Sequence, residues 1–310
     1  MADTEGWVFI VNPVAGSGFG AACAVTVHEM MERHGVRGKV VLTRAKGHAT
    51  ELAAEHAAQG FHTIIGVGGD GTLSEVAQAL VSNTKVTFGA VGAGTGNDFI
   101  HMLGFPDRFT DEDWRALFLG TTARMDIGRC NGKYFVNGMG LGFDAQVAFE
   151  NYHMENGGEV RGGSKSKYTW HIVKNIFAYK ERRMRVTIDG KTEERRSFLN
   201  TIANGRRIAG GLMLTPRAIA DDGMLDYCST DPLSLPMRFR ELVAVSRQNH
   251  LKQRVFHYVQ TSRIDFDFDE KVPAHLDGEL IFSQQFNIDV LPKALKSIIN
   301  TDGGHYFHTT

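Results

Sequence analysis

The chain has little cysteine and no long apolar run, and both absences restrict its class. Only three cysteines, Cys23, Cys130 and Cys228, occur among 310 residues. This odd, widely spaced set excludes a disulfide framework and a CxxC metal site, and it favours a reducing, cytoplasmic location. The first residues lack the basic region of a signal peptide, and no window reaches the roughly 18 uncharged apolar residues of a membrane span. We therefore expect neither a signal peptide nor a transmembrane segment.

An excess of charge of one sign is also lacking. The chain has 34 Lys and Arg against 35 Asp and Glu, a net charge of −1, which argues against global attraction to nucleic acid or anionic lipid. Hydrophobic residues make up 42%, which excludes a mostly disordered chain. Prolines are few, 7, but glycines number 35 and gather in short blocks between apolar runs. Such blocks indicate loops in which the backbone approaches a ligand closely.

The first part of the chain alternates between strand and helix patterns. Apolar runs predict strands, and stretches of helical periodicity ending near glycine predict helices. This alternation predicts an α/β domain whose parallel sheet carries helices on both faces. The expected strands are 7–11, 39–43, 63–67 and 86–91, and the expected helices are 21–33, 49–59 and 73–81.

After residue 123 the pattern changes to short, alternating β segments. Asp189-Gly190 is a hairpin sequence, and helical patterns interrupt the strands at 165–179 and 236–249. We expect a mainly antiparallel β-sandwich here. The predicted division is an α/β domain over 1–125, a sandwich domain over 126–290 and a final segment, 291–310, that returns to the first domain.

Two glycine-rich loops are the strongest local motifs. Gly68-Gly69-Asp70-Gly71-Thr72 joins a predicted strand to a helix, where backbone amides and the positive end of the helix dipole favour an anion. The alternative is an ordinary tight turn. A second loop, residues 92–99, also follows a strand, so both loops should face one crevice at the carboxyl ends of the strands. No P-loop motif and no clean GxGxxG is present.

These motifs, taken in order, resemble the diacylglycerol kinase catalytic-domain family, which includes bacterial lipid kinases and sphingosine kinases. The resemblance begins with Asn12-Pro13-Val14-Ala15-Gly16, the Gly69 to Thr72 core and the Gly94 to Phe99 loop. It covers nearly the whole chain. The further matching segments are 125–128, 137–145, 203–205, 210–211, 216–218, 221–226, 277–279 and 290–294.

The resemblance implies that ATP binds between the two domains. Backbone amides would neutralise phosphate oxygens, and Asp70 would be the essential acid of the phosphate loop, organising Mg²⁺ or its waters. The implied nucleotide-binding residues are Asn12, Thr43, Gly68, Gly69, Asp70, Gly71, Thr72, Glu75, Gly94, Thr95 and Asn97.

The resemblance also implies a Mg²⁺ site at Asp221-Asp222-Gly223. The Asp222 carboxylate would bind the ion, because hard cations prefer oxygen ligands. The alternative is a surface turn, which this tripeptide often forms. The other implied participants are the carbonyls of Ile219 and Met224, with waters connecting the ion to Asp98 and Asp126.

The motif Asp277-Gly278-Glu279 is the expected source of the general base. A carboxylate must accept the proton of the acceptor hydroxyl, and the resemblance assigns this role to Glu279, with Asp277 as a second carboxylate. Asp277-Gly278 is alternatively a hairpin turn. Asp144 is a candidate for contact with the lipid headgroup, and its alternative is a turn residue.

Two departures from the family pattern remove positive charge. Residues 17–19 replace a usual Lys or Arg, and His101 stands where an Arg is common. Basic and aromatic residues over 165–179 suit a bilayer interface. The alternative there is a core-packing helix with a solvated cationic face.

The resulting hypothesis is a lipid kinase that transfers the γ-phosphoryl group of ATP to a lipid hydroxyl. The acceptor would be a diacylglycerol, a sphingoid base, a ceramide or a phosphatidylglycerol. We expect a cytoplasmic protein in peripheral contact with the membrane, where it meets its lipid substrate, and its oligomeric state stays open. The alternatives are an NAD kinase and a non-catalytic regulator that binds lipid or nucleotide.

Overall fold

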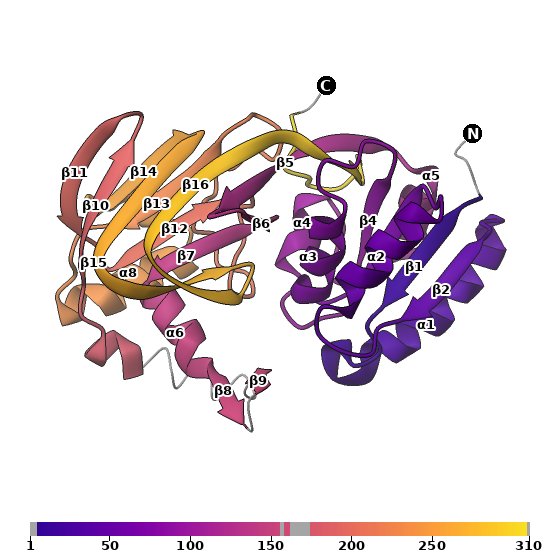
Figure 1. The fold of residues 1–310 in the computed structure, drawn as a ribbon, viewed down its shortest axis with the longest axis horizontal. Coiled ribbons are helices and arrows are strands. Elements are labelled where there is room, and N and C mark those ends of the chain that lie inside the picture. The colour runs from indigo at the N-terminus through magenta and orange to yellow at the C-terminus, as the bar shows by residue number, and fades with distance from the viewer. Residues whose placement is uncertain (1–4, 156–157, 162–173, 309–310) are drawn as a thin grey trace.

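A computed structural model describes residues 5–155, 158–161 and 174–308, which form two bodies side by side (Figure 1). The N-terminal body is built on a parallel sheet in the order β4-β3-β1-β2. Every residue of β1, β3 and β4 is buried, as expected for strands covered on both faces. The bounds are β1 (Trp7–Val11), β2 (Gly38–Leu42), β3 (Thr63–Gly68) and β4 (Thr87–Gly92).

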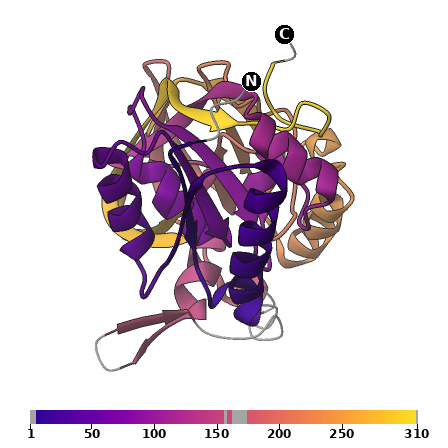
Figure 2. The ribbon, with the colours of Figure 1, turned by 90° about the vertical axis from the view of Figure 1, so that its right-hand side faces the viewer.

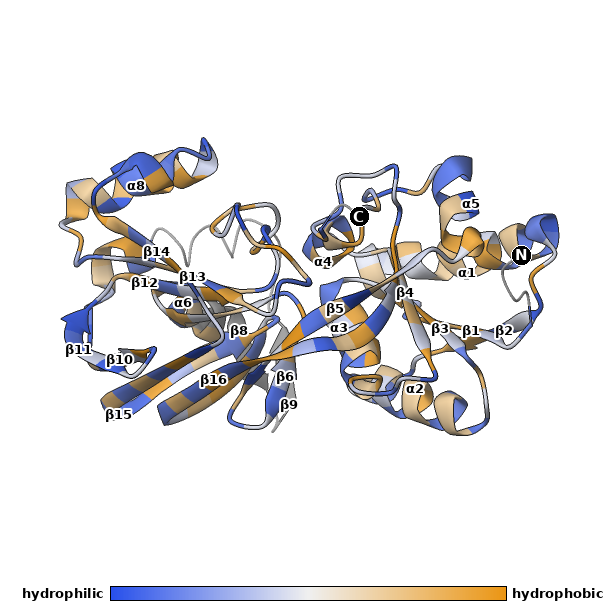
Figure 3. Cartoon of the chain, turned by 90° about the horizontal axis from the view of Figure 1, so that it is seen from above, coloured by the Kyte–Doolittle hydropathy of each residue, from blue (hydrophilic) through white to orange (hydrophobic). Residues whose placement is uncertain are grey.

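Helices cover both faces of this sheet, α1 and α5 on one and α2 and α3 on the other (Figure 3). The α/β arrangement predicted from the sequence is thereby confirmed. Gly16, Ser17 and Gly18 have left-handed backbone, so the regular part of α1 starts only after them, close to the predicted start. The helices are α1 (Ala15–His34), α2 (His48–Ala58), α3 (Asp70–Ala79), α4 (Asp98–Met102) and α5 (Asp111–Leu119).

The C-terminal body is mainly antiparallel, and the predicted sandwich is confirmed. Asp189 and Gly190, both with positive φ, form the tight turn between β10 and β11 as expected. The β8–β9 ribbon projects away from both bodies (Figure 2). The elements are β5 (Thr122–Cys130), β6 (Lys133–Phe135), β7 (Gly138–Gly142), α6 (Phe143–Asn151), β8 (Tyr152–Glu155), β9 (Gly158–Arg161), β10 (Arg183–Ile188), β11 (Lys191–Arg196), β12 (Leu199–Ala203), β13 (Leu225–Thr230), α8 (Leu235–Ser246), η1 (His250–Lys252), β14 (Phe256–Thr261), β15 (Arg263–Leu276) and β16 (Glu279–Ile298).

The long strand β16 connects the two bodies. Its first part pairs with β15 in the sandwich, and near its end Ser297 pairs in parallel with Phe88 of β4. Ile299, Tyr306 and Phe307 then pack into the same hydrophobic core as β1, β3 and β4. One hydrogen-bonded path of strands therefore runs through the whole molecule.

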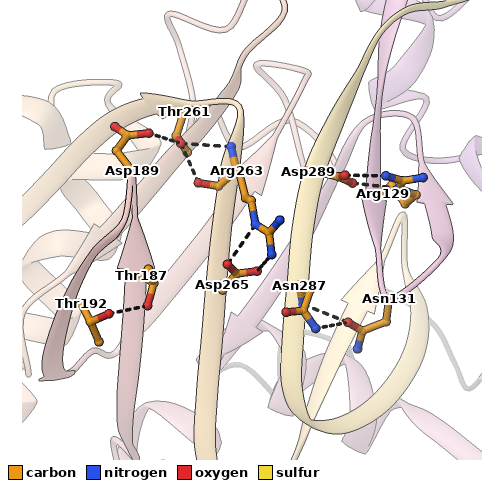
Figure 4. A network of polar contacts seen from close by, with 10 residues as sticks. All are labelled: Arg129, Asn131, Thr187, Asp189, Thr192, Thr261, Arg263, Asp265, Asn287 and Asp289. Carbon is orange, nitrogen blue, oxygen red and sulfur yellow. Dashed lines mark hydrogen bonds and ion pairs between the residues drawn. The ribbon is translucent and has the colours of Figure 1, made fainter.

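Polar pairs between neighbouring strands support one face of the sandwich (Figure 4). Arg129 of β5 binds Asp289 of β16 through two hydrogen bonds of 2.9 and 2.5 Å. Next to them, the backbone amide of Asn287 donates to Asn131 at 2.9 Å. Such cross-strand pairs help to hold the register of a sheet.

The predicted helix over 165–179 falls largely outside the described residues. Residues 174–178 are helical, and nothing is described for 162–173. The second predicted helix of this domain is α8. Within the described ranges, no helix is long and apolar enough to cross a bilayer.

Candidate active site

The predicted nucleotide-binding residues lie at the carboxyl ends of the four parallel strands. Asn12 follows β1, and its side-chain Nδ2 donates to the Thr72 hydroxyl in α3 at 2.9 Å. Thr43 follows β2, and its amide donates to Val11 O at 2.9 Å. The structure thus brings together residues separated by up to 60 positions, at the edge where open α/β sheets bind ligands.

The two glycine loops pack against each other without intervening side chains. A Cβ on Gly94 would lie only 2.4 Å from the Cα of Gly69, so glycine is required at this contact. Asn97, with φ of 51°, folds its side chain back to the amide and carbonyl of Gly94. Asp70 Oδ1 accepts a 2.9 Å hydrogen bond from the amide of Phe99, which joins the first loop to the second.

The N-terminus of α3 lies at this same edge of the sheet, directly after β3. Gly69 is its N-cap, and no side chain of the described residues caps the helix. The first amides of a helix lack intrahelical partners and carry the positive end of its dipole. This end of α3 is therefore suited to phosphate.

Asp98 lies at the start of α4 and is almost completely buried. Oδ2 accepts a 2.6 Å hydrogen bond from the amide of Gly210. Oδ1 lies 3.5 Å from Nε of Arg207, and both atoms lack a hydrogen-bond partner among the described residues. Burial, together with the nearby Asp70 charge, raises the pKa of Asp98 to about 6.

Asp277 is saturated by hydrogen bonds. It accepts from the Ser74 hydroxyl at 2.7 Å and from the amides of Val136, Asn137 and Gly138 at 2.7, 3.0 and 3.0 Å. Burial raises the pKa of this carboxyl, and these hydrogen bonds oppose the rise. With φ of 47°, Asp277 also forms the two-residue turn between β15 and β16, so the predicted hairpin turn is present.

Glu279 has a very different environment. Its carboxylate is about half exposed and lies 2.6 Å from Nζ of Lys46. Glu75 of α3 lies close by, where it accepts a 3.0 Å hydrogen bond from the amide of Gly47. Burial raises the pKa of Glu75, and the Glu279 charge adds to this rise. Glu279 is therefore an accessible carboxylate beside α3, whereas Asp277 is enclosed.

Asp144 begins α6 and faces the same hairpin. Its Oδ2 lies 3.5 Å from Nε2 of His275, and the two side chains meet over Gly140. A Cβ on Gly140 would lie 1.9 Å from Asp144 Oδ2, so only glycine leaves room for this carboxylate. Oδ2 is buried and, apart from this contact with His275, makes no hydrogen bond among the described residues.

The predicted metal residues fall into two groups. Asp98 lies with Asp70 and Arg207, whereas Asp126 lies with Asp221 and Asp222. Both Asp126 oxygens accept backbone amides, of Lys293 at 2.7 Å and of Gly223 at 2.6 Å. In the part of the chain that is described, no three His, Cys, Asp or Glu side chains converge as a metal-binding group.

The Asp221-Asp222-Gly223 segment is a turn, as its alternative interpretation states. Asp222 Oδ1 accepts the amide of Met224 at 2.9 Å, and Gly223 has φ of 77°. Burial raises the pKa of Asp222 and of Asp126, and neighbouring carboxylates add to both shifts. This crowding of negative charge fits a cation held by one carboxylate and backbone carbonyls, such as those of Ile219 and Met224.

Sequence reasoning missed four residues of this region. Ser74 and Lys46 contact the β15–β16 hairpin, and Arg207 pairs with Asp98. The Arg108 guanidinium stacks on the ring of Phe19 at 3.6 Å, above the segment that lacks the usual basic residue. No local motif marks these residues, because each acts on a segment distant in sequence.

Comparison with protein families agrees with this geometry. Residues 6–130 match the model of the diacylglycerol kinase catalytic domain. Residues 137–299 match the YegS C-terminal NAD kinase beta sandwich-like domain. The two matches correspond to the two bodies of the structure.

Individual relatives cover most of the chain. A Shewanella frigidimarina protein named "Probable lipid kinase YegS-like" is 28% identical over 85% of this chain and 89% of its own length. The diacylglycerol kinase of Bacillus subtilis is 27% identical over 87% of this chain and 88% of its own. The crystal structure of a diacylglycerol kinase from Bacillus anthracis has the same fold, with a TM-score of 0.78 at 22% identity over 97% of this chain and 99% of its own. The chain therefore belongs to the diacylglycerol kinase catalytic-domain family, with a YegS-type C-terminal domain, and is a lipid kinase.

Proposed function

We propose that this lipid kinase transfers the γ-phosphoryl group of ATP to the hydroxyl of a membrane lipid, with Glu279 as the general base. The observation that carries the proposal is the attachment of the β15–β16 hairpin to α3. Ser74 of α3 binds Asp277 at 2.7 Å, and two residues further on, Glu279 begins β16. The candidate base is thus held beside the helix whose N-terminus is suited to phosphate.

The different environments of the two carboxylates support Glu279 over Asp277 as the base. All four hydrogen bonds of Asp277 come from the protein itself, so its role is to position the hairpin. Glu279 is half exposed, and the ion pair described for it is the one with Lys46. A carboxylate in this position can accept the proton of a lipid hydroxyl as the new P–O bond forms.

ATP binding at the carboxyl edge of the parallel sheet would use the residues at the strand ends. The amides at the start of α3 and the loop held by Asn97 would contact phosphate oxygens. Arg108, stacked on Phe19, would supply positive charge where the segment itself has none. His101 does not replace the usual arginine, because burial lowers its pKa and it pairs with Asp107.

The acidic turn suits a structural Mg²⁺ ion held by one carboxylate and backbone carbonyls. It does not offer a cluster of carboxylates as ligands among the described residues. Asp222 would bind it together with the carbonyls of Ile219 and Met224. Asp126, whose two oxygens each accept a backbone amide, would connect to the ion through water. When bound, the ion would supply positive charge that neutralises this crowded acidic region.

The lipid acceptor would enter near Asp144. Its buried Oδ2, which lies 3.5 Å from His275 Nε2 and makes no hydrogen bond among the described residues, could accept one from a lipid headgroup hydroxyl. Diacylglycerol, sphingoid base, ceramide and phosphatidylglycerol all present such a hydroxyl beside apolar chains. The family assignment favours a lipid over NAD⁺ as acceptor, and an enzyme over a non-catalytic regulator.

A transfer assay tests the proposal directly. Labelled ATP would be offered with each of the four lipids in mixed micelles, and with NAD⁺, in the presence and absence of Mg²⁺. We expect one lipid class to be labelled, and Glu279→Gln to lower kcat by about 10²–10⁴-fold with little change in the KM for ATP. Glu193→Gln, an exposed change on β11, is the matched control. Labelling of NAD⁺ alone, or full activity of Glu279→Gln, would contradict the proposal.

A further inference from the structure

Helix α8 has its apolar side turned outward. Leu235, Phe239, Leu242 and Val243 follow the spacing of one helix face, and their side chains are 40%, 41%, 37% and 47% exposed. Figure 3 shows α8 at the periphery of the C-terminal body. Large apolar side chains gathered on one face of a peripheral helix indicate a binding surface rather than a random exposure.

The opposite side of α8 is buried and carries charged residues. Arg238 donates to the carbonyls of Leu233 at 3.1 Å and Ile176 at 2.6 Å, and to the Glu181 carboxylate at 2.7 Å. Glu241 is also buried and pairs with Arg240. A buried charge without such partners would be costly, so these contacts hold the helix in this orientation.

Phe177 extends the apolar side of α8. It is 60% exposed, and its ring centroid lies 5.7 Å from that of Phe239. The bond from Arg238 to Ile176 O fixes the neighbouring backbone against α8. We call Phe177, Leu235, Phe239, Leu242 and Val243 together the α8 face.

The charges around the α8 face are predominantly positive. Lys174, Lys180 and Arg247 are exposed in the two segments that form it, and Arg240 is exposed in its pair with Glu241. The acidic residues of these segments, Glu181 and Glu241, are largely buried in their pairs with arginines. An apolar face with a basic rim matches the interface of an anionic bilayer.

The inner side of α8 connects this surface to the candidate acceptor site. Met237 and Val245 pack in the same hydrophobic cluster as Phe143 and Tyr179. Phe143 directly precedes Asp144, whose Oδ2 is the candidate headgroup contact. The inner side of α8 and the residue next to Asp144 thus belong to one hydrophobic cluster.

We propose that the α8 face is the surface by which this protein binds anionic membranes. The choice of a lipid surface as occupant rests on the proposed function, because a lipid kinase must reach a substrate embedded in a bilayer. Two of the observations do not depend on the reaction: the contacts that orient α8, and the basic rim of the α8 face.

Binding to vesicles without ATP tests the proposal. The wild-type chain would be sedimented with vesicles of equimolar phosphatidylglycerol and phosphatidylcholine, and with vesicles of phosphatidylcholine alone. We expect the double variant Phe239→Gln, Leu242→Gln to lower partition onto the anionic vesicles by about tenfold or more. Lys180→Gln with Arg247→Gln should lower it by about fivefold per residue, on anionic vesicles only.

A matched control uses exposed apolar residues of the other domain. Val25 on α1 and Leu119 on α5 are 61% and 60% exposed, and Val25→Gln with Leu119→Gln should leave vesicle binding unchanged. All variants change exposed side chains, and circular dichroism would verify their folding. Light scattering would show whether the α8 face joins two copies of the chain.

Two outcomes would overturn the proposal. One is unchanged vesicle binding of the Phe239, Leu242 double variant. The other is an oligomer that becomes a monomer in that variant while vesicle binding persists, which would make a second copy the occupant. Vesicle binding is measured without ATP and so does not depend on the reaction. If the chain binds vesicles through the α8 face but labels no lipid, the proposed function is refuted and the membrane-binding proposal stands.

Discussion

The Ser74 hydroxyl donates a 2.7 Å hydrogen bond to Oδ2 of Asp277, although 203 residues separate them. Ser74 belongs to α3 of the parallel domain, and Asp277 belongs to the hairpin of the sandwich. Since the same carboxylate also accepts three backbone amides, one side chain ties together α3, the 136–138 segment and the β15–β16 turn. The placement of the β15–β16 hairpin beside α3 therefore depends on a contact between the two domains.

Loss of the Asp277 carboxylate should destabilise the protein. Asp277→Ala would leave buried amide donors without an acceptor, and we expect a loss of about 3 kcal/mol in the free energy of unfolding. Ser74→Ala removes one bond to a charged group and should cost about 1–2 kcal/mol. Urea unfolding measures both. Glu279→Gln is the control and should leave the midpoint nearly unchanged, and equal stability of all three variants would contradict this role for Asp277.

Asp70 should be essential for turnover through its charge as well as its hydrogen bond. Asp70→Ala removes the acceptor of the Phe99 amide and should abolish turnover with a stability loss of about 1–2 kcal/mol. Asp70→Asn keeps an oxygen acceptor for that amide, so it should retain the stability and still lose turnover. Steady-state kinetics and thermal unfolding of the pair separate the two effects, and near-normal kcat in Asp70→Asn would refute the role of the charge.

The acidic turn should determine the response to Mg²⁺. Asp222→Asn should raise the Mg²⁺ concentration needed for half activation by about tenfold or more, because it removes the proposed carboxylate ligand. Asp221→Asn is the matched control, since Asp221 Oδ1 accepts the amide of His308 at 2.9 Å instead. Mg²⁺ titrations of activity and of melting temperature would be compared. An unchanged titration in Asp222→Asn would mean that the segment is only a turn.

His250 should make the protein less stable in acid. It is fully buried, and its Nε2 lies 3.2 Å from Leu214 O. Burial lowers the pKa of His250 in the folded state, whereas its unfolded value is about 6.5. The unfolded chain therefore binds more protons, so stability falls as the pH drops below about 6.5 and through the folded pKa.

The His250→Gln variant isolates this contribution. Its free energy of unfolding would be measured by urea between about pH 5 and 8, the range in which histidine changes its charge. It should decline less in acid than that of the wild type. His257→Gln, at an exposed position, should keep the wild-type decline. Identical acid slopes for His250→Gln and the wild type would show that another group is responsible.

Much of the first domain could be predicted because its features are local. Continuous apolar runs bounded by glycine predict buried parallel strands, and the structure has β1, β3 and β4 close to the expected residues. The two glycine loops were also recognisable, since close backbone approach such as that of Gly69 and Gly94 requires glycine. Parallel pairing then places both loops at one edge.

The sequence by itself determined most strands and the two glycine loops, because backbone preferences and apolar periodicity act over a few residues, whereas the candidate carboxylates came from its resemblance to the family. Only the tertiary structure decided how those groups differ. It enclosed Asp277 and left Glu279 accessible, brought Arg108 over Phe19, and turned the apolar side of α8 outward. These outcomes depend on contacts between segments far apart in the chain, where packing and burial, rather than local preference, determine the energy.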